Sequence, residues 1–174
     1  FAGVVVRVGA RVRRFKVGDE VYARPDDDRI GTFAEFIAIR EQSLALKPAN
    51  LTMEDASSIP LVALTAWQTL IERGGLKKGQ KVLIHAGAGG VGLAAIQMAV
   101  NHGCTIFATA GSEKKLELLS EFGVHHPINY QKVDFEREVL RITGGEKIDV
   151  VLDSVGGSYF KKDGTKRSEP RSPT

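Results

Sequence analysis

The fold of this chain is decided by the stretch Val82-Leu83-Ile84-His85-Ala86-Gly87-Ala88-Gly89-Gly90-Val91-Gly92. Its apolar start predicts a buried parallel strand, and residues 90–101 predict the helix that follows. The glycines have the spacing G-x-G-x-x-G in the strand-to-helix context of a dinucleotide-binding turn. We expect Gly87 to permit the turn, Gly89 to admit a pyrophosphate, and Gly92 to bring helix and strand together. The helix N-terminus supplies N–H donors for the phosphates.

A regular alternation of strands and helices continues beyond this stretch. At this spacing it predicts a doubly wound parallel sheet whose four strands have the spatial order third, second, first, fourth. The fourth strand would then lie at an edge of the sheet. We expect strands at residues 81–86, 105–109, 126–129 and 148–153, and helices at 90–101, 113–122 and 134–142.

The first part of the chain has a different, β-rich pattern. Thr52 is expected to cap a helix, with Asp55 three residues later, and residues 61–73 predict a second helical stretch. From residue 163 onwards no residue is apolar, which predicts disorder. The strands expected in the β-rich part are 2–8, 21–23, 33–39 and 44–46. The domains expected are a β domain at 1–50, connecting helices at 51–80, a nucleotide-binding domain at 81–160 and a basic tail at 161–174.

The composition excludes several classes of protein. With 43% hydrophobic and 26% charged residues, the chain is neither wholly disordered nor collagenous. No apolar run approaches the ~20 residues of a membrane span. The single cysteine, Cys104, can form no internal disulfide or four-thiolate zinc site, and we expect it to be a buried hydrophobe in a cytoplasmic protein. The net charge of +3 lies entirely in residues 161–174, which favours a solvated tail over a nucleic-acid-binding arm.

The tip of the strand at 105–109 distinguishes between the two nicotinamide dinucleotides. An NAD site usually places Asp or Glu there to hold the ribose 2′-hydroxyl. Here the strand ends in Ala110-Gly111-Ser112, and Lys114 and Lys115 follow. A small residue, a hydroxyl and a lysine can accept the 2′-phosphate that a carboxylate would repel, so we predict NADP(H). Glu113 lies past the strand tip and can point outward, and Lys114 is expected to be a solvated helix position.

Four stretches, in order along the chain, carry a family resemblance. They are Ala2-Gly3-Val4-Val5 with Phe15-Lys16-Val17-Gly18-Asp19-Glu20-Val21, Leu64-Thr65-Ala66-Trp67, Ile84 to Gln97, and Ile148 to Gly157. Together they resemble the medium-chain dehydrogenase/reductase superfamily, in its zinc-independent quinone oxidoreductase branch. Over residues 1–160 the resemblance implies an α/β fold, in which a partial GroES-like β domain precedes a partial Rossmann-type sheet.

The resemblance also implies an activity and a set of cofactor contacts. The activity is NADPH-dependent hydride transfer to a quinone or an α,β-unsaturated carbonyl, in full-length relatives that are homo-oligomers. The implied pyrophosphate contacts are Ala88, Gly89, Gly90 and Val91. The implied 2′-phosphate contacts are Gly111, Ser112, Lys115 and Tyr130, with Gly157 close to the cofactor and Thr65 near the nicotinamide.

The sequence departs from the family pattern at both ends. Family chains are about twice as long, so we expect a fragment that lacks part of the substrate pocket and of the nicotinamide site. Three hypotheses stay open: an active reductase, an inactive cofactor-binding fragment that acts as an interaction protein, and an RNA-binding relative. The structural zinc lobe is excluded because its cysteines are absent, whereas catalytic zinc stays open. No metal ligand or general acid is predicted, and His85 is expected to pack at the strand end.

Overall fold

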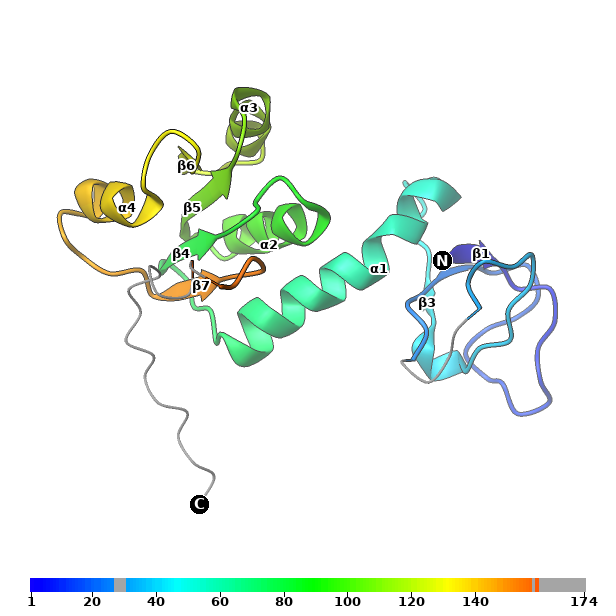
Figure 1. Cartoon of the computed structure of the whole chain (residues 1–174). Coiled ribbons are helices and arrows are strands. Elements are labelled where there is room, and N and C mark those ends of the chain that lie inside the picture. Colours follow the sequence, from blue (N-terminus) through cyan, green and yellow to red (C-terminus); the bar gives the residue numbers. More distant parts are fainter. Residues whose placement is uncertain (27–30, 158, 160–174) are drawn as a thin grey trace, which may run out of the picture. The chain divides into compact units, whose positions relative to one another are not determined.

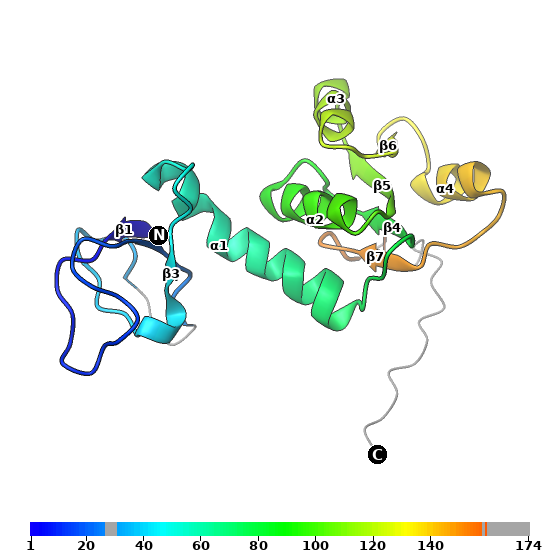
Figure 2. The ribbon, with the colours of Figure 1, turned by 180° about the vertical axis from the view of Figure 1, so that it is seen from behind.

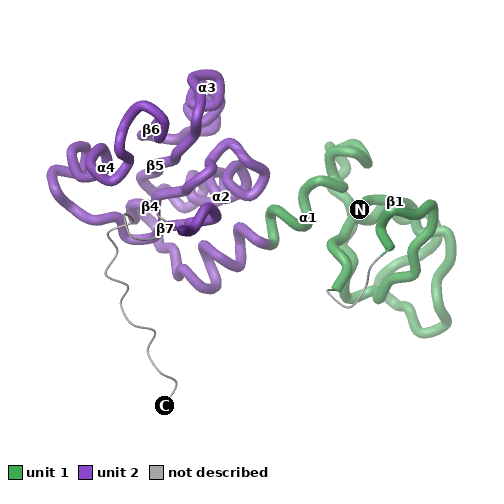
Figure 3. Tube along the Cα trace, viewed as in Figure 1, with its two compact units in different colours: residues 1–64 green, residues 65–174 purple. Residues whose placement is uncertain are grey.

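The computed structural model describes residues 1–26, 31–157 and 159. The chain divides into two compact units, residues 1–64 and residues 65–174 (Figure 3). Each unit builds its own sheet, antiparallel in the first and parallel in the second. The tail predicted to be disordered, residues 163–174, lies outside the described residues.

The first unit contains a three-stranded sheet in the order β1-β2-β3. The predicted strand at 2–8 forms only in its first half, and no strand forms among the described residues at 33–39. Phe33 and Phe36 are exposed there, so neither a neighbouring strand nor burial stabilises an extended segment. The elements of this sheet are β1 (Ala2–Val4), β2 (Glu20–Tyr22) and β3 (Ala45–Leu46), with the 3-10 turn η1 (Glu41–Ser43) before β3.

The helix α1 (Met53–Trp67) runs directly into a π-helix, η2 (Gln68–Arg73). The two helical stretches predicted separately therefore join, with Pro60 inside α1, where it removes one backbone N–H. Thr52 caps the helix as predicted. Its Oγ1 accepts a hydrogen bond from the Asp55 N–H (3.1 Å) and donates one to Asp55 Oδ2 (2.8 Å).

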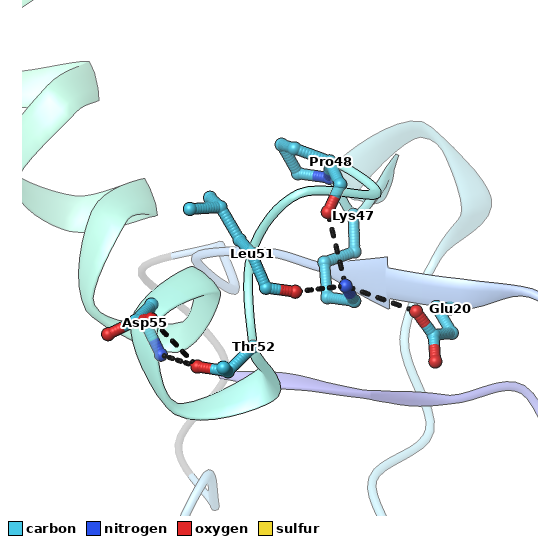
Figure 4. A network of polar contacts seen from close by, with 6 residues as sticks. All are labelled: Glu20, Lys47, Pro48, Leu51, Thr52 and Asp55. Carbon is cyan, nitrogen blue, oxygen red and sulfur yellow. Dashed lines mark hydrogen bonds and ion pairs between the residues drawn. The ribbon is translucent and has the colours of Figure 1, made fainter.

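A buried lysine fixes the connection from β3 to α1 (Figure 4). The Lys47 side chain is only 5% exposed, and its Nζ lies 3.1 Å from Glu20 Oε2. The same ammonium donates hydrogen bonds to the backbone carbonyls of Pro48 and Leu51. One charge thus ties the turn before the helix to the neighbouring strand β2.

The second unit is a four-stranded parallel sheet in the order β6-β5-β4-β7 (Figure 1). This is the predicted spatial order of third, second, first and fourth strands, and it confirms the α/β fold class. Within the described residues β7 lies at an edge. The strands are β4 (Lys81–Ile84), β5 (Thr105–Ala110), β6 (His126–Asn129) and β7 (Val150–Leu152). The helices are α2 (Gly90–Asn101), α3 (Glu113–Glu121) and α4 (Phe135–Thr143).

Both faces of this sheet are covered (Figures 1 and 2). Val82 and Ile84 point to one face, into a core that contains buried side chains of η2, α2 and α3. Leu83 points to the opposite face, where it packs with Phe107 and residues of α4. Burial on both faces explains why these strands are continuously apolar. No helix among the described residues has the length and apolar character needed to cross a membrane.

Candidate dinucleotide site

A pocket of about 280 Å³ opens where β4 and β5 end, within the second unit. Ligands of open parallel sheets bind outside the carboxyl ends of the strands, where this pocket lies. Residues of the glycine-rich turn and of the β5 tip form most of its walls. The lining residues are Ala86, Ala88, Gly89, Thr109, Ala110, Gly111, Lys115, Tyr130, Val155 and Tyr159.

The turn after β4 is made by Ala86 rather than by Gly87. Among the described residues, Ala86 is the one non-glycine residue with a positive φ, 51°. This left-handed conformation costs an alanine about 1–2 kcal/mol. Gly87 is required for a different reason from the one predicted, because a Cβ there would lie 3.0 Å from Ala108 Cβ and 3.0 Å from Leu119 Cδ2. Its role is therefore close packing rather than backbone freedom.

The helix α2 begins directly on this turn. A Cβ on Gly92 would stand 2.5 Å from the carbonyl oxygen of Gly87 and 2.6 Å from that of Ala86, so the predicted close approach is present. Gly89 is the N-cap residue, and no side chain caps the helix. Gly89 and Gly90 are both exposed. Backbone N–H groups at this helix start are accessible to an anion.

The tip of β5 brings a glycine, a lysine and a tyrosine together. A Cβ on Gly111 would lie 2.7 Å from Tyr130 Oη, so the glycine makes room for the phenol. Tyr130 is 43% exposed and lines the pocket with Lys115. Ser112 is the N-cap residue of α3 but makes no capping bond through its side chain. It lies next to the pocket without lining it.

The carboxylate of Glu113 is engaged outside the pocket. It lies 2.8 Å from Lys132 Nζ and accepts a hydrogen bond from Asn129 Nδ2 at 2.9 Å. Two hydrogen bonds lower the pKa of Glu113: the bond from Lys132 has the larger effect and the bond from Asn129 the smaller. Glu113 is not a lining residue, and among the described residues the pocket lining contains no carboxylate. Glu113 is thus engaged with Lys132 and Asn129 and forms no part of the pocket wall.

The predicted site residues fall into three groups. Five line the pocket, namely Ala88, Gly89, Gly111, Lys115 and Tyr130. Five others lie beside it without lining it: Gly87 in the turn after β4, Gly90, Val91 and Gly92 in the first turn of α2, and Ser112 at the N-cap of α3. The last two do not line it: Thr65 lies in α1, where its carbonyl accepts a hydrogen bond from Thr69 Oγ1, and Gly157 follows β7.

Sequence reasoning missed five lining residues of the pocket, namely Ala86, Thr109, Ala110, Val155 and Tyr159. Thr109 had a signal in the sequence, because this threonine directly follows the apolar run Ile106-Phe107-Ala108 near the end of β5. His85 is fully buried, as strand-end packing requires. Its ring lies edge-on to Phe135 at 4.7 Å and to Tyr159 at 4.9 Å.

Other groups with possible chemistry lie away from the pocket. Cys104 is 3% exposed and its thiol donates to the Lys77 carbonyl at 3.4 Å. Burial raises the pKa of this thiol, which matches the prediction of a small buried hydrophobe. Over residues 1–26, 31–157 and 159, no three His, Cys, Asp or Glu side chains are grouped so that they could hold a metal ion.

Comparison with known proteins places these features in a family. Residues 90–163 match the family model described as zinc-binding dehydrogenase. A highly reducing polyketide synthase of Didymella fabae is 40% identical over 165 residues, 92% of this chain and 8% of the synthase. A 2-methylene-furan-3-one reductase of Solanum lycopersicum is 41% identical over 162 residues, 89% of this chain and 40% of the reductase.

Solved structures with the same fold include three informative neighbours. An alcohol dehydrogenase superfamily protein of Novosphingobium aromaticivorans matches with a TM-score of 0.87 and 41% identity, over 93% of this chain and 49% of that one. The CurK enoyl reductase matches with a TM-score of 0.82 and 38% identity, over 93% and 48%. The quinone oxidoreductase of Escherichia coli, complexed with NADPH, matches with a TM-score of 0.84 and 34% identity, over 93% and 49%.

The chain therefore spans about half of each of these solved chains and less of the curated relatives. The relatives are 34–41% identical to this chain over about nine tenths of its length. The parallel strand order and the glycine-rich turn indicate the same family as these identities do. This chain belongs to the medium-chain dehydrogenase/reductase superfamily.

Proposed function

We propose that the chain binds NADPH as part of an oxidoreductase that reduces quinones or α,β-unsaturated carbonyls. The observation that carries the proposal is the pocket at the ends of β4 and β5. Gly89 and Lys115 both line it, and no carboxylate does so among the described residues. The start of α2 has no side-chain cap, so its N–H groups are available to the pyrophosphate. Lys115, in the first turn of α3, supplies a cation for the 2′-phosphate.

The roles of the residues follow from their places. Backbone N–H groups at the start of α2 bind the pyrophosphate, because Gly89 has no Cβ to obstruct it. Lys115 pairs with the 2′-phosphate, and the hydroxyl of Tyr130 donates to it. When bound, the dinucleotide supplies the hydride, whereas the protein binds and orients.

The substrate class is inferred from what the relatives' names have in common. A 2-methylene-furan-3-one, an enoyl group and a quinone each contain a carbon–carbon double bond conjugated with a carbonyl. Hydride addition to such a bond needs no side-chain nucleophile. We therefore propose conjugated carbonyl compounds as the substrate class.

The experiment has two steps that can fail separately. NADPH and NADH are first titrated against the 174-residue chain, and NADPH is expected to bind more tightly. Loss of NADPH absorbance is then followed with 1,4-benzoquinone, with a 2-enoyl thioester and with the matching saturated thioester as control. Absence of binding by either dinucleotide would refute the proposal. Measurable and equal rates of NADPH loss with the enoyl and saturated thioesters would refute the substrate class.

Binding without turnover is the second candidate, and the size of the pocket favours it. The pocket of about 280 Å³ is at the small end for a ligand site. Hydride transfer needs the nicotinamide within about 3.5 Å of the acceptor, which requires walls on that half of the cofactor as well. Within the described residues β7 is an edge strand, and we also propose that it promotes association, which light scattering would detect. NADPH binding without oxidation in the assay above would select this candidate.

A further inference from the structure

Thr109 stands at the back of the pocket in a short chain of hydrogen bonds. Its Oγ1 accepts from the backbone N–H of Ala86 at 3.3 Å and lies 3.1 Å from His85 Nδ1. The residue is 1% exposed, so its hydroxyl must find partners inside the protein. A hydroxyl carries one hydrogen, and donating it to His85 Nδ1 leaves a lone pair for the Ala86 N–H.

Ala86 is the residue that this hydroxyl holds. Its φ of 51° is unfavourable for alanine, so the conformation persists only where neighbouring groups enforce it. Two backbone bonds also cross the turn: the Gly87 N–H donates to the Thr109 carbonyl and the Gly89 N–H to the Ala86 carbonyl, both at 2.9 Å. The Gly87–Thr109 backbone bond does not depend on the side chain at 109, so the contribution of the hydroxyl can be isolated by substitution.

His85 is itself oriented by aromatic rings. It is fully buried, and its ring lies edge-on to Phe135 (4.7 Å, 70°) and to Tyr159 (4.9 Å, 81°). Rotation of the imidazole away from Thr109 would displace these two rings. Phe135 and Tyr159 therefore hold the His85 ring in place, and His85 in turn orients the Thr109 hydroxyl.

We propose that Thr109 is a positioning residue of the dinucleotide site. Its hydroxyl, oriented by His85, holds Ala86 in the left-handed conformation and so places the N–H groups at the start of α2 for the pyrophosphate. The ligand half of this inference rests on the proposed function, whereas the structural half needs no ligand.

The test compares three variants of the 174-residue chain. Thr109→Val keeps the shape and removes the hydroxyl, and Thr109→Ser restores it. Thr105→Val is the matched control, because it makes the same change at the opposite end of β5. Amide hydrogen exchange of Ala86, followed by NMR, reports the bond itself. Titration with NADPH reports binding, and thermal unfolding confirms that each variant is folded.

We expect Thr109→Val to accelerate Ala86 exchange and to weaken NADPH binding about fivefold to tenfold, the effect of one buried neutral hydrogen bond. Thr109→Ser and Thr105→Val should both resemble the wild type. Unchanged exchange and affinity in Thr109→Val would overturn the inference, as would a Thr109→Ser variant as impaired as Thr109→Val. A wild-type chain that binds neither dinucleotide would instead refute the proposed function, and the exchange rates alone would then decide whether Thr109 holds the turn.

Discussion

Gly92 lies so close to Gly87 that a Cβ built on Gly92 would stand 2.5 Å from the Gly87 carbonyl oxygen. The nearest atoms are all backbone, so they cannot rotate away as the end of a side chain can. The contact seats the first turn of α2 on the turn after β4. The third glycine of the motif is thus required by packing, before any ligand is considered.

Gly92→Ala is expected to lower the free energy of unfolding by about 2–3 kcal/mol, because the methyl group must push α2 off the turn. Urea denaturation measures the change. Gly3→Ala is the control, because a Cβ on Gly3 meets nothing within 4 Å. Equal stability of the two variants would show that the turn yields more easily than its backbone contacts indicate.

Gly89→Ala should have the opposite profile, a small effect on stability and a large one on binding. Its Cβ would lie 3.3 Å from the Ala86 carbonyl oxygen, a contact that a shift of a few tenths of an ångström relieves. The methyl group would nevertheless stand in the pocket lining, where the pyrophosphate must approach the backbone. We expect stability within about 1 kcal/mol of the wild type and NADPH affinity reduced about tenfold. Unimpaired NADPH binding would place the pyrophosphate elsewhere.

Lys47→Met should destabilise the first unit. The substitution preserves the buried stem but removes the donor that serves the carbonyls of Pro48 and Leu51 and the ion pair with Glu20. Losing these bonds should cost about 2 kcal/mol in urea denaturation. Lys16→Met, a change of the same kind at an exposed lysine, should stay within about 0.5 kcal/mol of the wild type. Equal effects of the two substitutions would mean that the network in Figure 4 contributes nothing net.

Glu113 predicts a pH dependence with a definite sign. Its pKa is lowered by the bonds from Lys132 and Asn129, so the folded state favours the ionised form. The stabilisation is present above the ordinary glutamate pKa and is lost as the pH falls through the lowered folded value. Glu113→Gln should therefore be less stable than the wild type near pH 7, and the difference should shrink under acid conditions. Glu117→Gln, at another exposed position of α3, is the control; a pH-independent difference at Glu113 would contradict the assignment.

The strand order of the second unit could be predicted because its signals are local and redundant. The apolar run Val82-Leu83-Ile84 indicates a strand that is buried on both faces. Each later strand is separated from the next by a helix of ordinary length. The predictions failed where structure depends on distant partners. Residues 33–39 have the composition of a strand, but a ladder needs a neighbour that local sequence does not reveal.

The candidate site could be predicted to a similar degree. The glycine spacing and the missing acid at the β5 tip located the pocket, and five predicted residues line it. Gly87 is the residue expected to permit the turn, whereas the positive φ lies at Ala86, where the Thr109 hydroxyl and the packing around the turn stabilise it. Tyr159 was missed because its place depends on where the chain returns after β7, which periodicity does not specify.

Cofactor choice is the prediction that tests the site most directly. Lys115 lines the pocket, whereas its neighbour Lys114 is exposed on α3 and does not. Lys115→Glu should weaken NADPH binding at least about tenfold (1.4 kcal/mol), because it replaces an attraction to the 2′-phosphate with a repulsion. NADH, which lacks that phosphate, should be affected much less.

Lys114→Glu makes the same change in net charge one residue away, so it controls for the general field of the protein. Titration of both variants with both dinucleotides gives four affinities to set against the two of the wild type. If Lys114→Glu weakened NADPH binding as much as Lys115→Glu does, the effect would be one of overall charge and not of a 2′-phosphate contact. If the wild-type chain bound NADPH and NADH equally, the absence of a carboxylate at the tip of β5 would have no bearing on cofactor choice, and the preference for NADPH would be wrong.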